Sequence, residues 1–170
     1  MGKILSKFVL EHPDCLYYLF LDTDTCFIQH DTIDTMIGEL NQEPFAFGIG
    51  PRLSSNGEME IEQGYREKIY ASRLHPCCAL VKNIPVFRRV VEAVGLSCVQ
   101  NLLARGEEYL DTLELASRVM KTHGYRHIVS SKMVLHFFSV SYDWEAREVM
   151  EYKARLRDRY LEEWRNEESA

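Results

Sequence analysis

The chain has 170 residues, which suits one domain with a substantial core better than two. Its formal net charge is -6 and hydrophobic residues make up 46% of the sequence, as in an ordinary globular protein. This acidic balance argues against a general binder of nucleic acids or anionic membranes, because such binders carry basic surfaces. We therefore expect a single domain over residues 1–170 that binds no nucleic acid.

The cysteines and the apolar segments bear on the cellular compartment in which the protein is expected. The five cysteines are odd in number, and their spacings match no zinc or redox motif, so free thiols in a reducing compartment are expected. Lys3 and Lys7 interrupt the apolar stretch near the N-terminus, so we do not interpret that stretch as a signal peptide. No segment approaches the roughly 20 apolar residues of a membrane span. We expect a cytoplasmic protein with no membrane span.

Helical and extended segments alternate along the chain, which is typical of α/β layer folds. A short amphipathic helix is expected before His12. The apolar stretch 16–21 then predicts a strand buried on both faces. Asp31 is typical of the N-cap of a helix, which we expect to reach Leu40.

The rest of the chain continues this alternation. Segment 44–50 predicts a strand that runs into glycines, and segment 77–83 predicts another. Pro85 suits the first turn of a helix through Ala93, which Gly95 ends. The other expected elements are an exposed loop over 51–64, a helix over 109–123, one or two strands over 126–138 and a charged amphipathic helix over 144–166. The expected architecture is a mixed, mostly parallel sheet flanked by helices.

Two aspartates, Asp22 and Asp24, follow the first predicted strand. Side chains at positions i and i+2 of a strand point the same way, so we expect the two carboxylates side by side. Close carboxylates repel each other, and a divalent cation such as Mg²⁺ removes that repulsion while also binding phosphate. Ligands of open α/β sheets lie beyond the C-terminal ends of strands, where this pair falls. The alternative is a solvated turn in which Asp24 caps the next segment.

The segment YYLFLDTDTCFI, residues 17–28, resembles the Asp-x-Asp segment of glycosyltransferases with the GT-A fold. The resemblance covers residues 5–140. It implies that Mn²⁺ or Mg²⁺ is held against the diphosphate of a nucleotide-sugar donor, with Asp24 on the metal and Asp22 on the metal or the ribose. It also implies transfer of the sugar to an acceptor that the sequence does not identify.

Later segments extend this resemblance. In FAFGIG, it implies that Gly48 and Gly50 line the sugar pocket, where glycines permit close approach of a ligand. In VLHFFS, it implies that His136 completes the metal shell. A histidine between apolar residues is otherwise interpreted as part of the core.

The segment GEEYLDTLELA resembles the acidic segment where inverting members carry a catalytic base. Asp111 is the first candidate for that role and Glu108 the second. Asp111 and Glu114 also have the spacing of a capping box, so a purely structural interpretation remains open.

The position of the Asp-x-Asp motif departs from the family pattern. In GT-A enzymes, a stretch of roughly 100 residues that holds the nucleoside commonly comes first, the size of a small domain. Here the strand 16–21 begins close to the first residue. We therefore expect a GT-A-like core that is truncated at its N-terminus, and leave open whether it is active alone.

Two alternatives belong to other classes. LDTDTCF also resembles the opening motif of haloacid-dehalogenase-type phosphatases, with Asp22 as nucleophile, Asp24 as general acid and Mg²⁺ beside them. Cys26 stands where that motif has Thr or Val, and the late strand offers no second acidic pair. The other alternative is a non-catalytic module that binds a partner chain or a second copy through the helix 144–166. The apolar stripe of that helix consists of Tyr152, Leu156, Tyr160 and Trp164.

The tetrapeptide HPCC, which contains His75, Cys77 and Cys78, suggests a metal site or a thiol nucleophile. Adjacent strand residues point to opposite faces, so the two cysteines cannot easily bind one ion together. We interpret them as small residues on a packed strand.

Overall fold

The computed structural model describes residues 2–54, 73–101, 108–137 and 147–167, and within these ranges the chain is of the α/β class. The helices are α1 (Gly2–Glu11), α2 (Thr32–Gln42), α4 (Pro85–Val94), α5 (Glu114–Thr122) and α6 (Arg147–Glu167). The strands of the larger sheet are β1 (Tyr17–Leu21), β2 (Thr25–Phe27), β3 (Ala46–Ser54), β4 (Cys78–Lys82) and β7 (Arg126–His136). A smaller sheet pairs β5 (Val99–Asn101) with β6 (Glu108–Leu110).

The larger sheet has the strand order β1-β4-β3-β7-β2. The prediction of a mixed sheet is confirmed, but the prediction that it is mostly parallel is wrong. Only β3 and β7 pair in parallel among the described strands, and the other three neighbouring pairs are antiparallel. The sequence does not indicate the direction of β4, because this strand is buried on both faces. A continuous apolar segment is compatible with parallel and with antiparallel pairing.

The sheet curls so that the connected ends of its two outer strands come closer together than they would in a flat sheet. β1 and β2 stand at opposite ends of the strand order, yet only Asp22–Asp24 separate them in the chain. This connection spans at most about 14 Å, whereas the outer strands of a flat sheet of this width would lie about 19 Å apart. The closing turn, residues Asp22–Thr25, is called the acid turn below.

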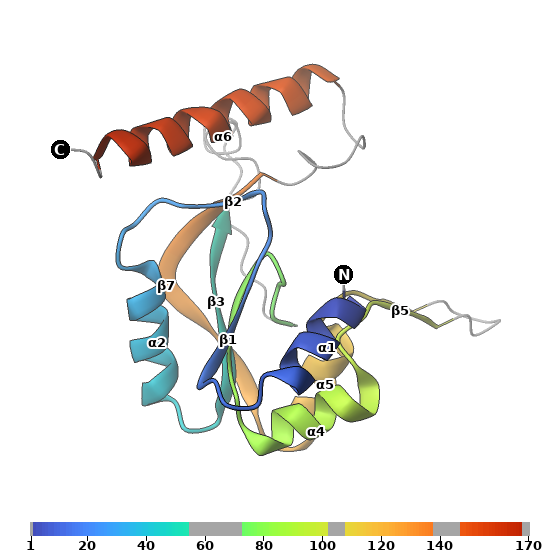
Figure 1. The fold of residues 1–170 in the computed structure, drawn as a ribbon. Coiled ribbons are helices and arrows are strands. Elements are labelled where there is room, and N and C mark those ends of the chain that lie inside the picture. Colours follow the sequence, from blue (N-terminus) through green and yellow to red (C-terminus); the bar gives the residue numbers. More distant parts are fainter. Residues whose placement is uncertain (1, 55–72, 102–107, 138–146, 168–170) are drawn as a thin grey trace.

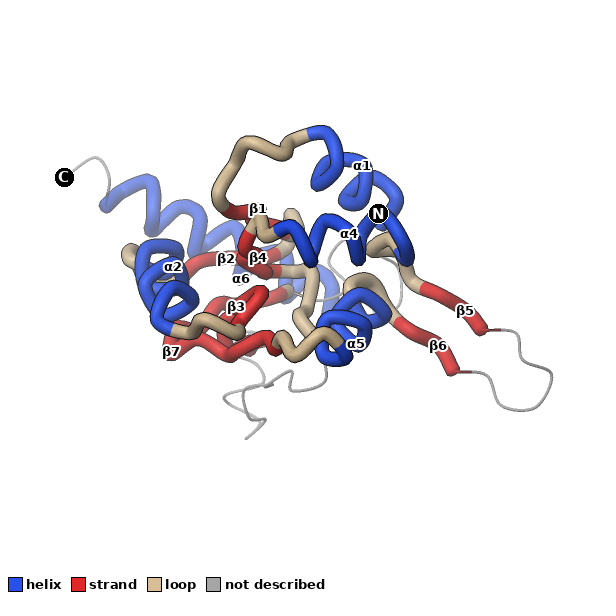
Figure 2. The backbone as a smooth tube through the Cα atoms, turned by 90° about the horizontal axis from the view of Figure 1, so that it is seen from below, coloured by secondary structure: helices blue, strands red, loops and turns tan. Residues whose placement is uncertain are grey.

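Helices cover both faces of the sheet. Figures 1 and 2 show α2 on one face and α1, α4 and α5 on the other. Alternate residues of β4 serve the two faces: Ala79 and Val81 join the cluster that includes α4, and Cys78 and Leu80 join the cluster that includes α2. The core therefore lies on both sides of the middle strands.

β1 is buried on one face only, so the prediction of burial on both faces is wrong. Tyr18 and Phe20 are buried, whereas Leu19 and Leu21 are 40% and 46% exposed. The physical reason is that Tyr18 and Phe20 pack in the cluster that includes α4, whereas Leu19 and Leu21 on the opposite face of this outer strand join none of the core clusters of the described residues.

Several helix boundaries follow the sequence. α4 begins at Pro85, and Gly95 ends it with a φ of 69°. α5 is shorter than predicted, because Leu113 adopts a left-handed φ of 68° and the residues before it belong to β6. Asp31 occupies the N-cap position of α2 without a capping hydrogen bond, since its carboxylate binds Lys132 instead.

α6 packs against the end of the sheet where β2 and β7 pair (Figure 1). Leu156 contributes to a cluster with Cys26, Leu135 and Phe137, and Tyr152 and Tyr160 pack against that cluster. Most of the predicted apolar stripe thus contacts the chain's own sheet. None of the described helices is long and apolar enough to cross a membrane.

Candidate metal site

The acid turn is held by hydrogen bonds to its own backbone and to the residue before β4. The Thr25 amide donates to the Asp22 carbonyl at 3.2 Å. The Cys77 carbonyl accepts from the Asp22 amide and from Thr25 Oγ1, both at 2.9 Å. Because β1 ends at Leu21, it is this turn, and not the alternation of strand side chains, that brings the two aspartates together.

His136 completes the cluster from the end of β7. It lies opposite Thr25 in the β2–β7 register, and its Nε2 is 3.3 Å from Asp24 Oδ1 and 3.9 Å from Asp22 Oδ2. One ligand atom from each of these three side chains lies within 4.8 Å of the others. The structure thus brings together the three residues that the sequence predicts as metal ligands, and metal binding itself stays a prediction.

The surroundings of Asp22 act against its negative charge. Burial raises the pKa of Asp22, and the negative charges of Asp24 and Asp111 raise it further, while His136 opposes the shift. The ionised form of Asp22 is therefore disfavoured in the folded chain. A divalent cation beside the carboxylates would reverse that balance, and two carboxylates with an imidazole are a ligand set that suits Mn²⁺.

Two further potential ligands, His75 and Cys77, lie next to His136. Neither was interpreted as a metal ligand from the sequence. The rings of His75 and His136 have centroids 5.5 Å apart, and the Cys77 amide donates to His75 Nδ1 at 3.3 Å. One ligand atom each from His75, Cys77 and His136 lies within 4.8 Å of the others. Cys77 and Cys78 both join the cluster on the α2 face, so the expectation that they point to opposite faces is wrong. The physical reason is that Cys77 precedes β4, so the alternation of strand side chains does not extend to it.

The two candidate catalytic bases, Asp111 and Glu108, have different surroundings. The Asp111 carboxylate pairs with Arg73 at 2.8 Å, and the Asp111 amide donates to Glu114 Oε2 at 3.1 Å. The predicted capping box is not formed, because the N-cap of α5 is Leu113 and Glu114 is its first residue. The charge of Asp111 nevertheless acts on both Asp22 and His75. Glu108 pairs with Asn101 in the small sheet. A catalytic role for either acid stays a prediction.

The two predicted sugar-pocket glycines lie in β3. A Cβ at Gly48 would stand 2.4 Å from Leu74 Cδ1 and 3.2 Å from the Leu80 carbonyl oxygen, so crowding inside the fold already favours a glycine there. A Cβ at Gly50 would stand 3.5 Å from the Cys78 carbonyl oxygen, an ordinary contact. Neither position identifies a sugar pocket, and that role stays a prediction.

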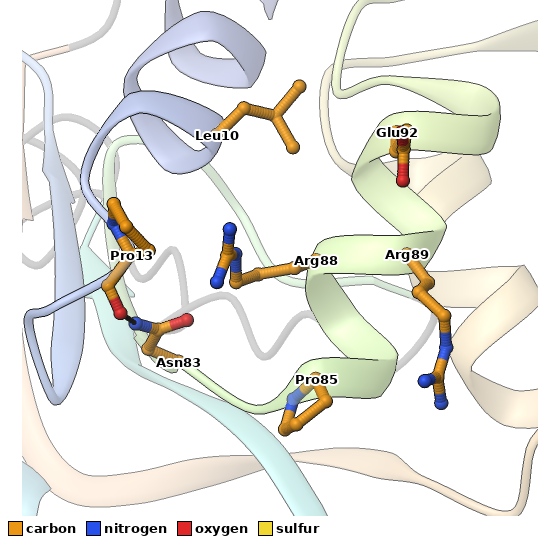
Figure 3. Close-up of a pocket in the computed structure, with 7 residues that line it drawn as sticks. All are labelled: Leu10, Pro13, Asn83, Pro85, Arg88, Arg89 and Glu92. Carbon is orange, nitrogen blue, oxygen red and sulfur yellow. Dashed lines mark hydrogen bonds between the residues drawn. The ribbon is translucent and has the colours of Figure 1, made fainter.

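A cavity of about 580 Å³ lies away from this cluster, against α1 and α4 (Figure 3). Its lining consists of Leu10, Pro13, Asn83, Pro85, Arg88, Arg89 and Glu92. The Asn83 amide within it donates to the Pro13 carbonyl at 2.7 Å. None of the metal-site candidates lines this cavity.

No family model matches the chain, and a search of curated proteins gives no match. The functional proposal therefore depends on the geometry of the cluster and on the resemblance of its motifs. Chemically, the cluster offers two carboxylates and an imidazole at one end of a sheet, an arrangement that can hold a hard or borderline divalent cation.

Proposed function

We propose that this chain is a metal-dependent, GT-A-like glycosyltransferase domain that moves a sugar from a nucleoside-diphosphate sugar to an acceptor. The observation that supports it most is the convergence of Asp22, Asp24 and His136. His136 is far from the acid turn in the sequence, yet it was expected there from the resemblance of a separate segment. A five-thiol chain without disulfides suits a reducing compartment such as the cytoplasm.

The three side chains would bind Mn²⁺ or Mg²⁺, with Mn²⁺ preferred because imidazole is a poorer ligand for Mg²⁺. Three protein ligands leave coordination positions for diphosphate oxygens. The ion would supply Lewis acidity that stabilises the negative charge developing on the leaving diphosphate. Through the bound ion, Asp22 and Asp24 would hold the diphosphate next to the end of β1.

Asp111 is proposed as the base that accepts the proton of the acceptor hydroxyl. Its carboxylate is 39% exposed, so an acceptor has access to it, and Arg73 holds it in place at 2.8 Å. Its charge is felt at Asp22, which puts it near the proposed donor site.

The test is Mn²⁺ titration by calorimetry, without and with UDP or GDP, followed by an assay for transfer from the matching nucleotide-sugar. The variants are Asp24→Asn and, as a matched control, Asp34→Asn on the exposed face of α2. Asp24→Asn should weaken Mn²⁺ binding by at least the roughly 10- to 100-fold that loss of a supporting residue causes at metal sites. The control should bind as the wild type does.

Metal-dependent nucleotide binding that disappears in Asp24→Asn supports the proposal. Metal binding without nucleotide affinity, together with hydrolysis of a phosphate monoester, would replace it with the phosphatase alternative. Equal Mn²⁺ affinity in wild type and Asp24→Asn would eliminate the metal site and leave a partner-binding module as the better account.

A further inference from the structure

We propose that His75, Cys77 and His136 form a second, thiolate-containing site for a soft transition metal such as Zn²⁺, and that this site shares His136 with the acid turn. The consequence is that Zn²⁺ bound there excludes Mn²⁺ from the acid turn. The thiolate site does not depend on the proposed function. The exclusion of Mn²⁺ does, because it needs Mn²⁺ to bind Asp22 and Asp24.

The distances bring the three ligand atoms close to the separations that one metal ion needs. They lie within 4.8 Å of one another, whereas ligands of a tetrahedral zinc ion stand roughly 3.3–3.6 Å apart, given bonds of about 2.0–2.3 Å. Closing that difference needs side-chain adjustments of about 1 Å. A water or a carboxylate of the acid turn can fill the fourth position.

The chemistry of the two sets differs in the way that separates metals. Thiolate and imidazole ligands select Zn²⁺ and similar ions, whereas carboxylates suit Mn²⁺ and Mg²⁺. Metal binding at this site uses the neutral imidazole of His75 and the thiolate of Cys77. Burial raises the pKa of the Cys77 thiol, and a bound metal opposes that effect by stabilising the thiolate.

The backbone connects the two sets of ligands. The Cys77 carbonyl accepts hydrogen bonds from both ends of the acid turn, from the Asp22 amide and from Thr25 Oγ1. The Cys77 amide donates to His75 Nδ1 in the metal-free chain. A metal bound by His75 would replace this hydrogen bond, because a neutral imidazole has one nitrogen lone pair. An ion that draws Cys77 and His136 together therefore acts directly on the position of Asp22 and on the imidazole that the acid turn needs.

The experiment is a Co²⁺ titration of the full 170-residue chain, followed by absorption, since a cobalt–thiolate bond gives a charge-transfer band in the near ultraviolet. Wild type should develop the band, Cys77→Ser should lose it, and Cys78→Ser should keep it. Cys78 is the matched control because it is the adjacent buried cysteine. Absence of the band in wild type, or its survival in Cys77→Ser, overturns the thiolate site.

A second variant covers the case in which Cys77→Ser does not fold, as judged by circular dichroism. His75→Gln leaves the thiol in place and should weaken Co²⁺ binding by about tenfold or more. Unchanged Co²⁺ affinity in this variant would contradict the proposed ligand set.

Exclusion of Mn²⁺ is measured separately by electron paramagnetic resonance of free Mn²⁺. Zn²⁺ should release bound Mn²⁺ from wild type, and Cys77→Ser should need about ten times more Zn²⁺ for the same release. Equal Zn²⁺ requirements refute the sharing of His136. Asp24→Asn separates the two proposals, because it should keep the cobalt–thiolate band while losing Mn²⁺ binding.

Discussion

Glu39 on α2 and Asp22 in the acid turn are both partly buried carboxylates, but their surroundings shift the two pKa values in opposite directions. Glu39 accepts hydrogen bonds from Ser130 Oγ at 2.5 Å and from the Ser131 amide at 3.1 Å. Burial raises the pKa of Glu39, but these bonds and the charge of Lys132 lower it by more. The metal-free fold therefore stabilises this carboxylate in its ionised form.

Asp22 has the reverse balance. Burial and the charges of Asp24 and Asp111 raise its pKa, and the opposing influence of His136 does not cancel them. The fold thus provides hydrogen-bond donors for Glu39 on the α2 face, whereas it brings Asp22 and Asp24 together so that their negative charges repel each other. Glu39 is thus stabilised as an anion by the fold itself, whereas the acid turn is where an added positive charge would relieve repulsion.

The largest expected effect is the response of stability to Mn²⁺. At 100 times its dissociation constant, an ion that binds only the folded state stabilises it by about 2.7 kcal/mol. Wild type and Asp34→Asn should show this increase in urea unfolding, and Asp24→Asn should not. A similar Mn²⁺-dependent increase in Asp24→Asn would mean that the ion binds elsewhere and would remove the contrast with Glu39.

Replacement of Glu39 should give the next largest effect. Glu39→Ala loses the hydrogen bonds to Ser130 and Ser131, and bonds to charged groups contribute about 1.5–3 kcal/mol. We expect the free energy of unfolding to fall by about 2 kcal/mol, with Mn²⁺ affinity unchanged. Asp34→Ala on the exposed side of the same helix should stay within about 0.5 kcal/mol of wild type. A loss of Mn²⁺ binding in Glu39→Ala would show that the two regions are coupled.

Asp22→Asn should have a smaller effect of opposite sign. The amide removes a charge that the fold disfavours and leaves the backbone hydrogen bonds of the acid turn in place. Without metal, we expect the free energy of unfolding to rise by about 0.5 kcal/mol, as is common when a functional site loses an unfavourable charge. Urea unfolding in a chelator measures it. A decrease comparable with that of Glu39→Ala would show that Asp22 is a structural acid as well.

The sequence predicts those parts of the site that local spacing determines. Asp22 and Asp24 stand out because a short motif follows an apolar strand, and His136 was found through the resemblance of its own segment. His75 and Cys77 were set aside because the adjacent cysteines were expected on opposite faces of a strand, and their neighbour His136 belongs to a strand far along the chain. The closeness of these residues to His136 depends on the order of the strands in the sheet. The spacing of residues within HPCC contains no information about that order.

The fold was predictable to a similar degree. The positions of most strands follow from apolar stretches, and Pro85 and Gly95 mark the ends of α4. The direction of β4 could not be predicted, since its residues are apolar on both faces. The start of α5 was missed because Leu113 takes a backbone conformation that L-residues rarely adopt and that its identity does not indicate.

The smallest effect is the pH dependence that Glu39 contributes. Its pKa in the folded chain is lowered from the ordinary value of 4.5. The folded state therefore binds this proton less readily than the unfolded state, and the carboxylate contributes stability at pH values above 4.5 that is lost as the pH falls through the lower folded value.

Glu39→Gln isolates this contribution, because the amide does not titrate while the other acids of the chain remain. The difference in unfolding free energy between wild type and Glu39→Gln should be constant from pH 7 to about pH 5 and should shrink below that. Urea unfolding at a series of pH values measures it. A difference that grows as the pH falls would mean that Glu39 is disfavoured as an anion, as Asp22 is, and the contrast between α2 and the acid turn would fail.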